Sequence, residues 1–327
     1  MSNEFDLSDF SITKQAEYRR FEFKFNWLFF YVFGMVCYSV LPIFIYFKIL
    51  FFILTEKKTV KRSIMRAEIF DSFLYMQFWN IVLIIADFSM IRIPYTTFFT
   101  KYFATENPQV LMKFIVFLYF WATYASQLFT LLFCALRVSI LYAVPETTTE
   151  TINKYIPPII VTCTLFAALP HLSSEILCLQ LTEPYSYGSF LIISVLHATN
   201  KIVLVSNLSF YITVAMILVV LNMLMMLKIR RNKSMNAFQS TTKSAKVERT
   251  LTVTMIILLF PMIFGYLVSI GEIFRIPQFS YVLLFRALVQ DFRVHIVTCY
   301  FYSTNPVFKA TSPQSSVIHV SHVSRLT

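Results

Sequence analysis

Long apolar runs separated by short polar segments dominate this chain of 327 residues. A helix needs about 20 consecutive, mostly apolar residues to cross the hydrocarbon core of a bilayer. The pattern therefore predicts an all-α integral membrane bundle, with tails of residues 1–26 and 304–327 outside it. Seven stretches are long enough to cross, namely 27–54, 69–91, 110–136, 155–177, 202–227, 251–270 and 281–303. A further apolar run, Phe190–Leu196, is too short.

Lysine and arginine residues near the span ends predict the orientation of the bundle, because cytoplasmic loops carry an excess of both. With the N-terminus outside, outer segments hold eight of these residues, Arg92 among them, and inner segments hold sixteen. This places the N-terminal tail outside the cell and the C-terminal tail in the cytoplasm. It also explains the net charge of +11 without a nucleic-acid partner, since anionic lipid at the cytoplasmic leaflet attracts such residues.

Composition excludes several classes of protein. Hydrophobic residues make up 57% of the chain and charged residues 14%, whereas soluble domains carry about 25% charged residues. Four glycines cannot form a glycine-rich phosphate loop, and no H-E-x-x-H or G-x-S-x-G motif is present. The five cysteines show no C-x-x-C spacing, so no zinc site is predicted. We expect neither an enzyme nor a bound cofactor or metal.

Polar residues inside the apolar spans are costly and therefore are candidates for function. A set of six lies in the second and seventh spans: Asn80, Asp87, Gln290, Asp291, Arg293 and His295. At 100° per residue, Arg286, Gln290 and Arg293 share one face of the seventh helix, while Asp291 and His295 share another. Similar depths predict that Asp87 pairs with Arg286 and that Asn80 lies near Asp291 and Arg293. These polar residues could take part in signalling, or they could simply hold the helices together; the sequence favours neither role.

The third span carries Lys113, Phe117, Trp121 and Tyr124 at spacings of four, four and three. Together with Arg286, this stripe predicts an outward-facing ligand pocket with aromatic walls and cations. Ordinary packing is the alternative, since aromatic stripes at helical spacing usually face a neighbouring helix. An apolar ligand and a carboxylate ligand are both compatible with these residues.

Two further residues, Pro261 and Arg137, each have a dynamic and a static interpretation, the static one being a fixed kink for Pro261 and a membrane anchor for Arg137. Pro261 lies within the sixth span, where a proline removes a backbone hydrogen bond and can act as a hinge. Arg137 ends the third span at the inner face, where it either contacts a partner or anchors the helix in the headgroups.

Seven spans, an outer N-terminus, Arg137 and Pro261 together resemble a G-protein-coupled receptor. The chain departs from the rhodopsin-like pattern, because no acid precedes Arg137 and no cysteine at the top of the third span could bridge Cys178. It more closely resembles the nematode serpentine chemoreceptors, the gamma class in particular. The stretches that carry the likeness are Val247–Val253, Phe285–Val294 and Tyr300–Lys309.

The resemblance implies a chemosensory receptor in the plasma membrane of a sensory neuron, cilia included. It implies a small-molecule ligand in the outer half of the bundle and a heterotrimeric G protein at the inner face. The basic residues that would meet the G protein are Arg137, Arg230, Arg231, Lys246 and Arg249. A ligand-gated seven-span channel and a transporter remain alternatives; an intramembrane hydrolase would need a G-x-G-D motif, which is missing.

Overall fold

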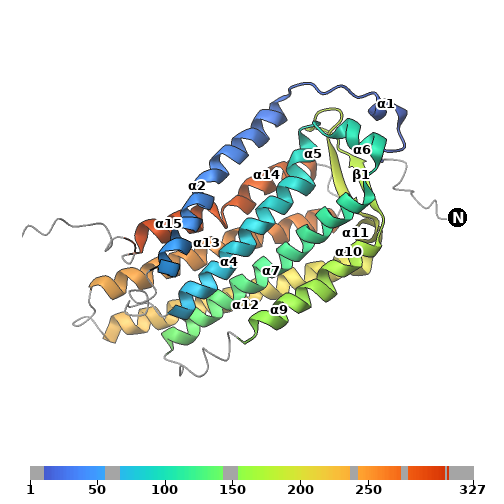
Figure 1. The fold of residues 1–327 in the computed structure, drawn as a ribbon. Coiled ribbons are helices and arrows are strands. Elements are labelled where there is room, and N and C mark those ends of the chain that lie inside the picture. Colours follow the sequence, from blue (N-terminus) through green and yellow to red (C-terminus); the bar gives the residue numbers. More distant parts are fainter. Residues whose placement is uncertain are drawn as a thin grey trace, which may run out of the picture.

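The computed structural model describes residues 11–55, 67–142, 154–235, 242–273, 279–305 and 308. These residues form an elongated bundle of helices that run roughly along one common axis (Figure 1). At one end of the bundle lie a short hairpin, labelled at β1, and the small helices α1 and α6 (Figure 1). We call this the hairpin end, and the opposite end the far end.

The first three predicted spans are helices. Helix α2 covers Trp27–Thr55, and helix α7 covers Gln109–Leu141. The second span is α4 (Ala67–Asp87), which continues through a π-helical turn, η2 (Phe88–Arg92), into α5 (Ile93–Tyr95). Helices α4 and α7 pack along much of their length and form the centre of the bundle.

The fourth predicted span, 155–177, is shorter than the sequence suggests. It consists of α9 (Ile156–Thr162), the π-helical turn η3 (Cys163–Ala168) and α10 (Leu169–Ser173). Strand β1 (Ile176–Gln180) then begins and pairs antiparallel with β2 (Phe190–Ser194). Apolar residues of Ile176–Leu177 that we assigned to a helix thus belong to a hairpin, and the short run Phe190–Leu196 supplies its second strand.

The last three spans include one broken helix. Helix α12 (Lys201–Met235) follows the short α11 (Val195–Thr199), and α13 (Thr242–Ile273) continues through Pro261. The seventh span divides into α14 (Phe279–Asp291) and α15 (His295–Thr304), with turns at residues 292–294. Two of the predicted polar residues lie at this break: Asp291 ends α14, and Arg293 lies in the turn.

The hairpin end is held by contacts from several segments. The backbone N–H of Ile12 donates to the carbonyl of Cys178 at 2.9 Å, so the N-terminal segment lies along β1. Helix α6 (Thr100–Glu106) joins through Thr100, whose hydroxyl donates to the carbonyl of Gly188 at 2.7 Å. Gly188 has φ +96°, and a Cβ there would lie 2.4 Å from the ring of Phe21. Glycine is therefore required at this turn.

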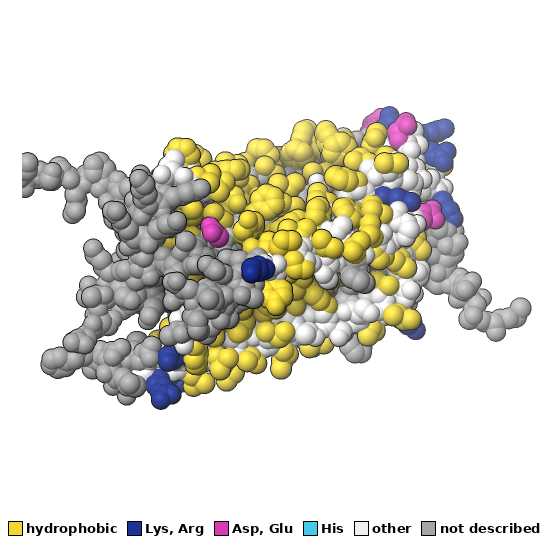
Figure 2. Space-filling view, turned by 60° about the horizontal axis from the view of Figure 1, so that its bottom comes forward, with side chains coloured by type: hydrophobic (Ala, Val, Ile, Leu, Met, Phe, Trp, Pro, Cys, Tyr) yellow, Lys and Arg dark blue, Asp and Glu magenta, His cyan; other side chains and the backbone are white. Residues whose placement is uncertain are grey.

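The outside of the bundle is apolar. Hydrophobic side chains cover most of the middle of the face shown in Figure 2, and most of its lysine and arginine side chains lie toward its ends. Helix α2 alone exposes Phe30, Phe33, Phe44, Phe47 and Phe51. Within the described ranges, five helices are long and apolar enough to cross a membrane. Such a surface is too large for a soluble monomer and fits an all-α membrane bundle.

Candidate functional site

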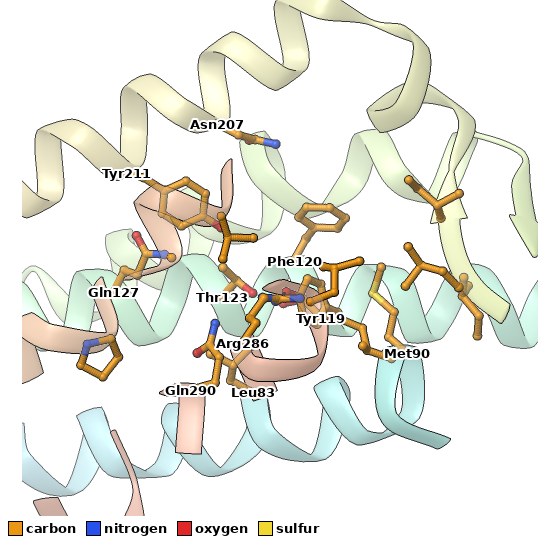
Figure 3. A pocket seen from close by; sticks show the side chains of 18 of the residues that line it. Leu83, Met90, Tyr119, Phe120, Thr123, Gln127, Asn207, Tyr211, Arg286 and Gln290 are labelled. Atoms are coloured by element: carbon orange, nitrogen blue, oxygen red, sulfur yellow. Dashed lines mark hydrogen bonds between the residues drawn. The ribbon is translucent and has the colours of Figure 1, made fainter. Parts of the chain in front are cut away.

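A cavity of about 130 Å³ lies inside the bundle beside the hairpin. Helices α4, α7, α12, α13 and α14 form its walls, and strand β2 closes it toward the hairpin end (Figure 3). Its polar lining residues are Tyr119, Thr123, Gln127, Asn207, Tyr211, Arg286, Gln290 and Arg293. Its apolar residues include Leu83, Met90, Phe120, Leu191, Ile192, Leu204, Pro261, Val268 and Leu283.

Arg286 reaches into this cavity from α14 (Figure 3). Its guanidinium contacts the hydroxyl of Tyr119 and lies 5.7 Å from the centre of that ring. Arg286 Nη2 is also 3.7 Å from Asp87 Oδ1, so the two side chains that we expected to pair do lie within ion-pair distance. Tyr119 and Asp87 together hold Arg286 between α7 and α4.

Arg293 follows the break in the seventh span and also lines the cavity. Its Nη2 donates to Thr130 Oγ1 at 3.1 Å, and Nη1 lies 3.4 Å from Ser126 Oγ. Its Nε is buried without a hydrogen-bond partner. Over the described residues, no carboxylate lies within ion-pair distance of Arg293.

Arg92 is the central residue of the polar network, although we counted it with the outer loops. It is 0% exposed, its Nε is 2.6 Å from Asp87 Oδ2, and its two Nη atoms lie 2.9 and 2.7 Å from the carboxylate of Asp291. The cause is the π-helical turn η2. Residues five apart point about 140° apart on an α-helix, but the wider π turn brings Asp87 and Arg92 onto one side.

Asp291 connects this network to α2. The hydroxyl of Tyr38 contacts its carboxylate, and His295 Nδ1 lies 2.7 Å from its backbone carbonyl. His295 Nε2 lies 3.1 Å from Ser39 Oγ. The seventh span therefore directs Arg286, Gln290 and Arg293 toward the cavity and directs Asp291 and His295 toward α2, as the helical spacing predicts.

Asn80 reaches the seventh span through an intermediate residue. Its amide nitrogen lies 3.5 Å from Gln77 Oε1, and Gln77 Nε2 donates to the carbonyl of Arg293 at 3.3 Å. Gln77 is fully buried and was missing from our predicted network. A glutamine three residues before Asn80 shares its helical face, which is the signal that could have identified it.

The residues of the predicted aromatic stripe do not line this cavity. Trp121 packs against Trp79 of α4 with ring centres 5.0 Å apart, and Phe117 packs against Trp121 at 5.6 Å. Neither they nor Lys113 and Tyr124 are among the lining residues of this cavity. Trp121 lies two positions from Tyr119 and from Thr123, which is 200° around the helix. The contacts of these two rings are those of helix packing.

Tyr124 belongs to the supporting wall. Its hydroxyl contacts the side-chain oxygen of Asn207, and its ring packs edge-on against Phe210. Asn207 itself lines the cavity. Tyr124 thus positions a wall residue of α12.

The candidate G-protein contacts lie toward the far end. Arg137 is buried on α7, while Arg230 and Arg231 are exposed near the end of α12. Lys246 and Arg249 belong to α13, but their side chains lie outside the described residues. The tails are described only in part, because residues 1–10, 306–307 and 309–327 lie outside the described ranges.

Cys178 of β1 faces Met112 of α7, with 3.3 Å between the two sulfur atoms. Burial raises the pKa of the Cys178 thiol to about 12. Nearby, burial raises the pKa of Tyr187, which stacks on Tyr18 at the surface of the hairpin end. In the part of the chain that the structure describes, the cysteines are free, and no group of three His, Cys, Asp or Glu residues is placed to hold a metal.

An apolar helix bundle with a partly open cavity beside one end is compatible with a helical membrane receptor. The family model of the serpentine type 7TM GPCR chemoreceptor Sru matches residues 12–311, and the chain belongs to this family. The match supports the serpentine chemoreceptors, as the sequence motifs indicate, but it gives no support to the gamma class. A comparison with curated proteins finds no match.

Proposed function

We propose that this chain is a chemosensory receptor that binds a small molecule in the cavity and signals to a heterotrimeric G protein at the far end of the bundle. The observation that carries the proposal is the position of the cavity. It lies between five helices and the hairpin, so its occupant touches most of the elements that a receptor would rearrange. Membership of the serpentine chemoreceptors supports the sensory role.

The orientation follows from the same proposal. The hairpin end faces the outside, and the far end, with Arg137, Arg230 and Arg231, faces the cytoplasm at the plasma membrane or the ciliary membrane. The burial of Arg92 removes one charge from the outer side of our count, which strengthens the excess of lysine and arginine on the inner side. An epitope tag at Met1 should bind antibody on intact cells; binding only after permeabilisation contradicts this orientation.

Signalling would work by a shift between conformations. A ligand moves such an equilibrium only as far as it binds one conformation better than the other. Pro261 and Gly265 of α13 and the broken seventh span all contact the cavity, and both elements extend toward the far end. We expect them to transmit occupancy of the cavity to the inner face.

The test is a ligand panel applied to cells that express the full chain, with G-protein dissociation as the readout. A matched pair of variants identifies the site. A Cβ at Gly265 meets no atom within 4 Å and lies at the cavity wall, whereas a Cβ at Gly34 also meets none but lies on the exposed side of α2. Gly265→Leu should abolish the response by filling the cavity, and Gly34→Leu should leave it intact.

Two results would contradict the proposal. Currents that survive blockade of G proteins indicate a ligand-gated channel. An unchanged response of the Gly265→Leu variant, at equal surface expression, places the ligand somewhere other than in this cavity.

A further inference from the structure

We propose that the cavity takes a small organic acid, whose carboxylate pairs with Arg293 in the positive potential that Arg286 adds. The apolar body of the ligand, about the size of one benzene ring, fills the remaining space. This inference rests on the proposed function, since it specifies the chemical class of the ligand for the same cavity.

The charges around the cavity do not balance. Among the lining residues, all of which the structure describes, two are arginines and none is an aspartate or glutamate. Their neutral polar neighbours include Thr123, Gln127 and Asn207, which neither repel an anion nor compensate a cation. A ligand with a negative charge would therefore meet attraction on one side and no opposing carboxylate.

The polar network behind the wall increases this imbalance. It contains three arginines, Arg92, Arg286 and Arg293, but two carboxylates, Asp87 and Asp291. Arg92 takes both carboxylates at 2.6–2.9 Å, which leaves Arg286 a contact of 3.7 Å with Asp87. Arg286 is thus partly compensated, and Arg293 has no acidic partner among the described residues.

Arg293 provides an independent argument for an anionic ligand. Its side chain is 3% exposed, and its Nε–H, which is a strong donor, has no acceptor. A buried guanidinium in a membrane bundle is costly unless it is paired. A carboxylate accepts two parallel N–H bonds from one guanidinium, and therefore supplies both the acceptor for Nε and the missing charge.

The volume of the cavity and its apolar walls limit the part of the ligand that carries no charge. A closed cavity of roughly 150 Å³ holds a benzene molecule; this one measures about 130 Å³ but is open on part of its boundary, so a ligand with a single ring does not have to fit entirely inside it. Leu83, Phe120 and Val268 contribute apolar walls away from the arginines. A compound with one acidic group on a compact apolar skeleton can place its charge at the arginines and its apolar part against these walls.

The experiment compares benzoate with benzamide, which has nearly the same shape but no charge. Equilibrium dialysis of each radiolabelled compound against the purified full chain in detergent micelles gives both dissociation constants. We expect benzoate to bind at least about tenfold more tightly than benzamide, which corresponds to about 1.4 kcal/mol. Both compounds should lose binding in Gly265→Leu and keep it in Gly34→Leu.

A second matched pair tests the charge. Arg293→Gln removes the unpaired cation and should bring the two affinities within about threefold of each other. Lys113→Gln removes a half-buried cation of α7 that is not part of the cavity wall, and should leave the preference for benzoate unchanged. If Arg293→Gln fails to fold, Arg286→Gln replaces it and should reduce the preference for benzoate.

The outcomes separate this inference from the proposed function. Equal or tighter binding of benzamide, lost in Gly265→Leu, overturns the anionic ligand but supports a ligand cavity. Absence of binding by both compounds to folded wild-type chain overturns the inference on ligand class, and the G-protein assay then decides the function independently. A preference for benzoate that persists in Arg293→Gln and Arg286→Gln shows that the anion binds elsewhere and also overturns the inference.

Discussion

Arg92 should contribute more to the stability of the bundle than any other charged side chain described here. Replacement by methionine keeps much of the apolar stem and removes the guanidinium. Two carboxylates, with side chains 4% and 2% exposed, then lose their cation inside the bundle. Breaking a buried ion pair by removal of one partner costs about 3–5 kcal/mol, because a charge stays buried without compensation.

The lost hydrogen bonds alone cannot account for that magnitude. Hydrogen bonds between helices in a membrane contribute about 0.6 kcal/mol each on average, since the unfolded chain in the membrane also finds partners. Arg92 makes three short bonds to the two carboxylates, so their sum stays near 2 kcal/mol at most. The remainder must come from the uncompensated charge of Asp87 and Asp291.

Thermal unfolding in detergent measures the effect, with a thiol-reactive dye as the probe, because Cys134, Cys163 and Cys178 are buried until the chain unfolds. A loss of about 3–5 kcal/mol lowers the midpoint by roughly 6–10 °C at about 2 °C per kcal/mol. The triple variant Arg92→Met, Asp87→Asn, Asp291→Asn should recover most of this loss. Lys113→Met is the control with no expected change. An unchanged midpoint for Arg92→Met, or no recovery in the triple variant, refutes the reasoning.

Further predictions concern the hairpin end and the buried arginines. Gly188→Ala forces a Cβ into the ring of Phe21 at φ +96° and should cost about 1–3 kcal/mol in the same thermal assay, whereas Gly34→Ala, in the interior of α2 with open space around it, should cost nothing and gain up to about 1 kcal/mol. Met112→Ala removes the buried side chain that packs on Cys178 and should cost about 2–5 kcal/mol in the same thermal assay; an unchanged midpoint would contradict the contact. Because the pKa of Cys178 is raised from 9.0 to about 12, its contribution to stability is complete below pH 9 and is lost as the pH rises toward 12. The thermal midpoint of the wild-type chain should therefore fall more steeply across that range than the midpoint of Cys178→Ala, and equal slopes would exclude this effect.

The long apolar runs predict the helices well, because the bilayer sets their length and leaves few alternatives. The division of the seventh span into two polar faces also follows from spacing, since Arg286, Gln290 and Arg293 recur at four and three residues. Neither the break at residues 292–294 nor the π-helical turn at Phe88–Arg92 could be predicted in this way. Both depart from 100° per residue, and both depend on contacts with other helices.

Two differences between the sequence-based expectation and the structure have the same physical origin. Arg92 looks like a loop residue because it follows an apolar run, yet tertiary pairing with Asp291 draws it into the bundle. The stripe from Lys113 to Tyr124 looks like a pocket wall because its spacing is regular, yet spacing alone does not say which neighbour a face meets. Here that neighbour is Trp79 for Trp121. Sequence patterns identify faces, and the packing of whole helices decides their partners.

The single β-bridge that the Ser11–Ile12 segment makes with β1 has a consequence for the edge of the sheet. An uncovered strand edge presents a row of free N–H and C=O groups, and it invites strands of other molecules. Here the amino-terminal segment occupies the side of β1 that β2 leaves open. This segment therefore protects β1, at Cys178 and Leu179, against pairing with a strand of another molecule.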